Sequence, residues 1–300
     1  MAEQSLEKIP PLPPLPGRPS VPLPPGACDS HGHIFGPFDR FPLAASRSYT
    51  PPEATFEAHR AMMEAVGFSR AVVVQGSAHG TDNRAILDGV ARSDGRLRGI
   101  VVIDNSVTDE ELANMAASGI VGARFTELVS TRYAGGMKGV SRFSELEKLG
   151  PRLREHGLHA QLFSNCPTIV ANLDMLLGLD LPLVIDHMGR IGPGDWGPTD
   201  ADFQRLLACV REGRMWVKLT ALRSSRDFPD YADARPFHEA FVAANPDRLL
   251  FGSDWPLLNL GERTPDVGKL VDIFRDWTGP ELSERILVDN PARLYGFGPI

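Results

Sequence analysis

The sequence predicts a (β/α)₈ barrel of the TIM type, an α/β fold, and three observations support this. Short runs rich in apolar and β-branched residues alternate with amphipathic stretches along most of the chain. The 300 residues leave room for eight such units, close to the roughly 250 residues typical of the fold. No glycine-rich phosphate-binding turn follows an early strand, as the rival open, doubly wound sheet would normally show.

Residues 1–26 are predicted to form a Pro-rich N-terminal arm, and residues 27–300 a single barrel domain. The stretch 10–25 reads "PPLPPLPGRPSVPLPP" and contains nine prolines. Proline lacks a backbone N–H and fixes φ, so this stretch should run as polyproline II or coil. We expect it to lie across its own domain; a ligand for an SH3-type module is the alternative.

The barrel strands are expected at eight apolar or β-rich runs. They are residues 27–33, 70–75, 98–103, 120–125, 158–163, 182–186, 215–219 and 248–253. Several are continuously apolar, as expected for parallel strands covered by helices. Amphipathic stretches such as 53–66 and 107–118 are expected to be helices between them.

Polar residues follow several of these strands, at the end where barrels of this kind place their active sites. His31 and His33 end the first strand, and their spacing points both side chains to one face. His187 follows the sixth strand in "DHMGR", and Asp254 follows the eighth in "GSDWP". A lone histidine is often a packing residue and a lone aspartate often a turn former, but four such residues at one end of a barrel favour a site.

Three imidazoles and a carboxylate permit two kinds of chemistry. They can bind one divalent metal ion. Without a metal, the histidines would polarise a carbonyl while Asp254 takes a proton from water. Both lead to attack of water on an activated carbonyl, and arginines near the strand ends indicate an anionic substrate.

The composition excludes several other classes. A net charge of −7 argues against nucleic-acid binding. No apolar run is long enough to span a membrane, and no leader pattern begins the chain, so a cytoplasmic protein is expected. The three cysteines show no CxxC spacing. Monomer and homodimer both remain open.

Seven segments in order resemble the amidohydrolase superfamily, and within it the subgroup of 2-pyrone-4,6-dicarboxylate lactonase and related lactone enzymes. They are "DSHGHIFGP", "VVVQGSAHGTDN", "GIVGARF", "VIDHMGR", "VKLT", "GSDWP" and "DNPARLYGF". The resemblance covers roughly residues 26–297. It implies hydrolysis of a small anionic lactone, carboxylated or sulfonated, in the degradation of aromatic compounds.

The resemblance also implies roles for individual residues. The catalytic residues would be His31, His33, His187 and Asp254, which are also the candidate metal ligands if a metal is bound. The substrate-binding residues would be Tyr49, Ser77, His79, Arg124, and Arg223 or Arg226. The superfamily resemblance implies zinc or manganese, whereas the lactonase subgroup works without metal, so either no cofactor or one divalent ion, zinc first, is expected.

Three departures from the subgroup pattern leave the substrate open between a pyrone dicarboxylate and a muconolactone derivative. Beyond Arg124 the next basic residue is Arg132, where the lactonase has a nearer arginine, and Phe163 and Asn165 replace a tyrosine and an acid. One alternative is a sugar-acid lactone hydrolase or isomerase; the isomerase pattern has an amide in place of Asp254. Others are a metal-dependent decarboxylase of the superfamily, and a noncatalytic sensor.

Overall fold

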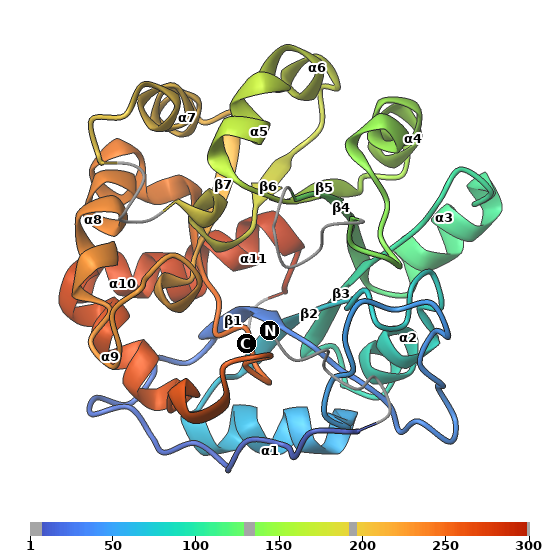
Figure 1. The fold of residues 1–300 in the computed structure, drawn as a ribbon, viewed down its shortest axis with the longest axis horizontal. Coiled ribbons are helices and arrows are strands. Elements are labelled where there is room, and N and C mark those ends of the chain that lie inside the picture. The colour runs from blue at the N-terminus through green and yellow to red at the C-terminus, as the bar shows by residue number, and fades with distance from the viewer. Residues whose placement is uncertain (1–7, 129–135, 192–196, 299–300) are drawn as a thin grey trace.

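Eight parallel strands form one sheet in chain order (Figure 1). The computed structural model describes residues 8–128, 136–191 and 197–298. The strands are β1 Cys28–Gly32, β2 Arg70–Val74, β3 Leu97–Val101, β4 Ile120–Glu127, β5 His159–Ser164, β6 Leu183–Ile185, β7 Met215–Leu219 and β8 Leu249–Phe251. A parallel bridge between Gly32 and Trp255 joins the two ends of the sheet. The predicted barrel is therefore confirmed, and all eight predicted strands are present.

Helices surround the strands as an outer layer (Figure 1). They are α1 Phe56–Val66, α2 Arg84–Ala91, α3 Asp109–Ala117, α4 Phe143–Glu155, α5 Cys166–Ala171, α6 Leu173–Gly178, α7 Ala201–Arg211, α8 Arg235–Ala244, α9 Val267–Thr278, α10 Pro280–Glu284 and α11 Asn290–Tyr295. The predicted helix at 53–66 begins later because the side chain of Thr55 caps it, accepting a hydrogen bond from the backbone N–H of Ala58. Among the described residues, no helix has both the length and the apolar character needed to cross a bilayer.

The hydrophobic core has two layers, one between strands and helices and a smaller one inside the barrel. The inner cluster combines strand residues such as Val72 and Leu250 with Tyr295 and Phe297 from the end of the chain. The Arg98 side chain at the start of β3 donates to the carbonyl of Tyr295 at 3.2 Å. The end of the chain therefore closes the barrel at the N-terminal ends of its strands, and the polar residues gather at the opposite end.

The Pro-rich arm contacts the start of α9. The backbone N–H of Gly17 donates to Asp266 Oδ2 at 2.7 Å, and the hydroxyl of Ser20 donates to Asp272 Oδ2 at 2.7 Å. A Cβ atom on Gly268 would lie 2.5 Å from the carbonyl oxygen of Gly17. Glycine at this position lets the arm backbone approach the helix closely.

Candidate active site

The closure of the barrel brings His31, His33 and Asp254 together. The backbone N–H of Asp254 donates to the carbonyl of His31 at 2.7 Å, and that of His33 donates to the carbonyl of Trp255 at 2.8 Å. Asp254 has a φ of 60°, a left-handed conformation that is uncommon outside glycine. Two neighbouring segments thus hold the carboxylate and both histidines through backbone hydrogen bonds.

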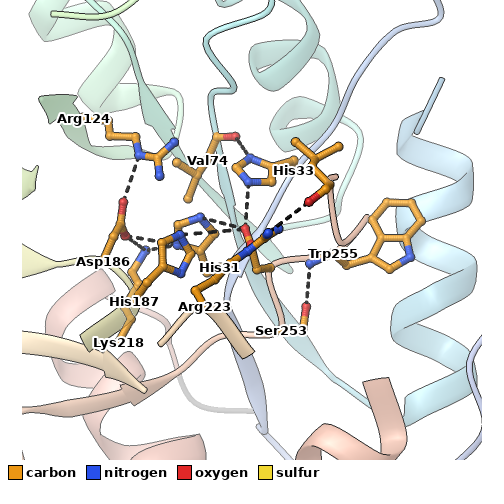
Figure 2. A network of polar contacts seen from close by, with 12 residues as sticks. His31, His33, Val74, Arg124, Asp186, His187, Lys218, Arg223, Ser253 and Trp255 are labelled. Atoms are coloured by element: carbon orange, nitrogen blue, oxygen red, sulfur yellow. Dashed lines mark hydrogen bonds and ion pairs between the residues drawn. The ribbon is translucent and has the colours of Figure 1, made fainter. Parts of the chain in front are cut away.

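The imidazoles of His31, His33 and His187 lie close together (Figure 2), and all three lie near one oxygen of Asp254. The Oδ1 atom lies 3.1 Å from Nε2 of His33, 3.6 Å from Nε2 of His31 and 3.9 Å from Nε2 of His187. The other oxygen accepts a hydrogen bond from Nε of Arg223. Burial alone would raise the pKa of Asp254, but the charges of Arg223 and His187 outweigh burial and hold it well below its usual value. Asp254 is therefore an ionised, buried carboxylate at neutral pH.

The hydrogen bond of His33 to Val74 shows which of its ring nitrogens carries a proton. Its Nδ1 lies 2.7 Å from the carbonyl oxygen of Val74, which can only accept, so Nδ1 carries a proton. In a neutral ring, Nε2 would then present a lone pair to Asp254 Oδ1 at 3.1 Å. That contact is favourable only with a proton or a metal ion between the two atoms.

A second buried carboxylate, that of Asp186, contacts His31 at its other ring nitrogen, Nδ1. Asp186 Oδ2 accepts from Arg124 Nε at 2.9 Å and from Gln161 Nε2 at 3.2 Å. Its Oδ1 lies 3.1 Å from Nδ1 of His31 and 3.6 Å from Nζ of Lys218. Burial works against the charged form of Asp186, yet Arg124 and His31 hold its pKa well below the usual value. Burial also lowers the pKa of Lys218 to about 8.

The donor set fits one metal ion. Ligand atoms of His31, His187 and Asp254 lie within 4.8 Å of one another, and all three residues are buried. Nε2 of His31 has no hydrogen-bond partner although it is buried. Such an atom fits either a bound cation or an oxygen of a substrate.

A cavity of about 280 Å³ opens in front of Asp254. Its described wall consists of His33, Tyr49, Ser77, Arg124, Leu128, Met137, Phe163, His187, Arg190, Leu222, Arg223, Asp254, Leu258, Asn259 and Leu260. Seven of the residues selected from the sequence are thus brought together around one space. The cavity suits a small ligand, and its arginines favour an anionic one.

Three of the selected residues lie outside this wall. His31 is beneath the cavity, against Asp254. His79 is almost fully buried and stacks on Phe35 with 5.9 Å between ring centroids. Arg226 is exposed, so of the two arginines after β7 it is Arg223 that faces the cavity. Arg132 lies outside the described residues.

Arg190 is a cavity residue that the sequence did not indicate. It ends a turn, His187–Arg190, in which all four residues have a φ between 48° and 65°. Only one of the four is a glycine, so the left-handed turn leaves little trace in the sequence. The one feature of the sequence that could have indicated Arg190 is its position three residues after His187, which follows a strand.

The chain is similar to several known proteins in sequence and in fold. The chain is 37% identical over 278 residues to 4-sulfomuconolactone hydrolase of Hydrogenophaga intermedia, covering 91% of this chain and 90% of that protein. It is 35% identical over 287 residues to 2-pyrone-4,6-dicarboxylate hydrolase of Comamonas testosteroni, covering 91% of each. A crystal structure of a candidate 2-pyrone-4,6-dicarboxylic acid hydrolase from Acinetobacter baumannii, with citric acid bound, superposes with a TM-score of 0.76 at 26% identity, covering 91% of this chain and all of that one. The amidohydrolase family model matches residues 28–297, and the chain belongs to this family.

Proposed function

We propose that the protein is a lactonase that opens the ring of a small anionic lactone, carboxylated or sulfonated, with water. The observation that carries the proposal is the buried carboxylate of Asp254, which lies among three histidines and faces a small cavity containing arginines. The two relatives above, named as hydrolases of a sulfonated muconolactone and a pyrone dicarboxylate, support the substrate class. Both are lactones that carry acidic groups.

The cavity explains how the substrate would be oriented. Arg124 and Arg223 present guanidinium groups to it, and guanidinium binds carboxylate or sulfonate in a bidentate manner. Arg223 also holds Asp254 through its Nε atom. A substrate acid that draws on the charge of Arg223 would strengthen Asp254 as a base when the lactone is bound.

The reaction then needs one proton acceptor and one group that stabilises negative charge. Asp254 removes a proton from water as the water oxygen bonds to the lactone carbonyl carbon. His33 and His187, which line the cavity beside Asp254, and His31 beneath it stabilise the oxyanion that forms. The ring C–O bond then breaks, and the proton held on Asp254 passes to the departing ring oxygen. The product is an open-chain acid.

His31, His187 and Asp254 would also hold a divalent ion, with His33 beside them. When bound, such an ion would polarise the lactone carbonyl as a Lewis acid. Arg124 and Arg223 would orient the substrate in the same way with or without the ion.

The test is proton release from a panel of lactones: pyrone dicarboxylate, carboxylated and sulfonated muconolactones, and aldarolactones. We expect rapid acid release from at least one anionic lactone, and Asp254→Asn should lower kcat by at least ~10²-fold with a smaller effect on KM. Each reaction is run with and without chelator pretreatment to measure metal dependence. Full activity of Asp254→Asn would show that another group is the base.

A further inference from the structure

We propose that Arg190 binds an acidic group of the substrate, together with Arg124, at the edge of the cavity marked by Phe163. This inference rests on the proposed function and names a binding residue for it. Both arginines lie near the same aromatic ring. The guanidinium carbon of Arg124 lies 4.3 Å from the ring centroid of Phe163, and that of Arg190 lies 5.7 Å from it.

The charges around the cavity indicate what should occupy this corner. Among the described residues of its wall are three arginines, Arg124, Arg190 and Arg223, and one carboxylate, that of Asp254, while Asp186 behind the wall pairs with Arg124. Two guanidinium groups over one ring repel each other, and an anion between them would turn this repulsion into attraction. The aromatic ring keeps both side chains oriented toward the same space.

Hydrogen bonds to the protein fix where Arg124 and Arg223 lie. Arg124 donates through Nε to Asp186 at 2.9 Å. Arg223 donates through Nε to Asp254 and through Nη1 to the carbonyl of Leu258 at 3.0 Å. These bonds place Arg223 beside Asp254, the reacting carboxylate, and Arg124 beside Asp186. An acidic group distant from the lactone carbonyl would therefore meet Arg124 and Arg190 rather than Arg223.

The backbone at Arg190 supports a functional role. The turn His187–Arg190 places four consecutive residues in the left-handed region, three of which are not glycine. This conformation is strained for residues with a Cβ atom, and such strain gathers at ligand-binding sites. The turn places both its first and last residues, His187 and Arg190, in the cavity wall. This one turn thus places His187 at the reacting end of the cavity and Arg190 at its anion-binding end.

The test compares pairs of lactones that differ by one acidic group: pyrone dicarboxylate with a pyrone monocarboxylate, and sulfomuconolactone with muconolactone. For Arg190→Met we expect KM to rise about tenfold or more for the diacid, with kcat changed less than KM and the monoacid little affected. Arg190→Lys keeps the charge and should recover part of the loss. The control is Arg205→Met, an exposed arginine on α7 away from the cavity.

Equal loss on both members of a pair, or no change in KM, would overturn the proposal. A second readout does not depend on turnover: calorimetric titration with citrate, a tricarboxylate. Wild type and Arg205→Met should bind citrate equally, and Arg190→Met about tenfold more weakly. If wild type hydrolyses no lactone but this difference appears, the proposed reaction fails and the anion site stands. If citrate binds all three alike, the anion site fails.

Discussion

At the residue scale, the protonation state of Asp254 depends on one neighbour more than on any other. Burial disfavours its carboxylate, and Arg223 is the largest of the charges that offset burial. A base acts only when it is ionised, so activity should persist above the pKa of Asp254 and be lost as pH falls through it. For the wild type, this acidic limb should lie below 3.8, the ordinary value for an aspartate.

Replacing Arg223 should move that limb. Without its guanidinium, burial dominates and the pKa of Asp254 rises, so the acidic limb of kcat/KM should shift upward by ~1–3 pH units in Arg223→Met. The measurement is the pH profile of kcat/KM for wild type and variant, with Arg205→Met as control. An unchanged limb, with only a higher KM, would mean that Arg223 binds substrate without tuning the base.

At the element scale, the union of β8 with β1 is what positions the site. Asp29 on β1 accepts hydrogen bonds from the backbone N–H of Ser253 at 2.8 Å and from that of His31 at 3.1 Å. Its carboxylate therefore joins the two segments beneath the site. The sequence predicts both strands, but it does not show which groups the side chain of Asp29 contacts.

The same limit explains what else the sequence could and could not predict. The eight strands follow from apolar runs, and His31, His187 and Asp254 converge because parallel strands end at one rim. Whether Arg223 or Arg226 faces the cavity depends on the short loop after β7. That loop has no regular sequence pattern from which side-chain directions could be predicted. Arg190 depends on a left-handed turn with a single glycine. Local patterns therefore predict elements and strand ends, whereas side chains carried by irregular loops need coordinates.

Gly252 lies just after β8, where this segment packs closely against β1. A Cβ atom here would lie 2.7 Å from Cβ of His31. In Gly252→Ala the two segments must separate, which should lower the free energy of unfolding by about 1–3 kcal/mol and reduce kcat as Asp254 moves from His31. Urea denaturation and lactone turnover measure both effects. Gly178→Ala in α6, where a Cβ meets nothing within 4 Å, is the control and should not lower stability. Wild-type behaviour of Gly252→Ala would contradict this packing.

At the scale of the whole molecule, the arm and the barrel meet beside the active site. Residues Pro10–Pro14 line a second cavity, of about 800 Å³, on the outer side of Tyr49 and the 256–261 loop. Tyr49, Leu258 and Leu260 belong to the walls of both cavities. The arm therefore packs behind residues that face the substrate, although none of the described arm residues lines the catalytic cavity itself.

Deleting residues 1–22 should separate the contribution of the arm from that of the barrel. The deletion removes the hydrogen bonds that the N–H of Gly17 donates to Asp266 and that the N–H and hydroxyl of Ser20 donate to Asp272. Each is worth about 0.5–1.5 kcal/mol, so the free energy of unfolding should fall by about 2–4 kcal/mol. The barrel should still fold with unchanged circular dichroism, because its core clusters begin at Ala27. KM should rise while kcat is retained, since Tyr49 loses packing and Asp254 does not. Deletion of residues 1–7 alone keeps every contact described for the arm and is the matched control. A chain that no longer folds without residues 1–22 would make the arm part of the barrel domain, against the boundary predicted at residue 26.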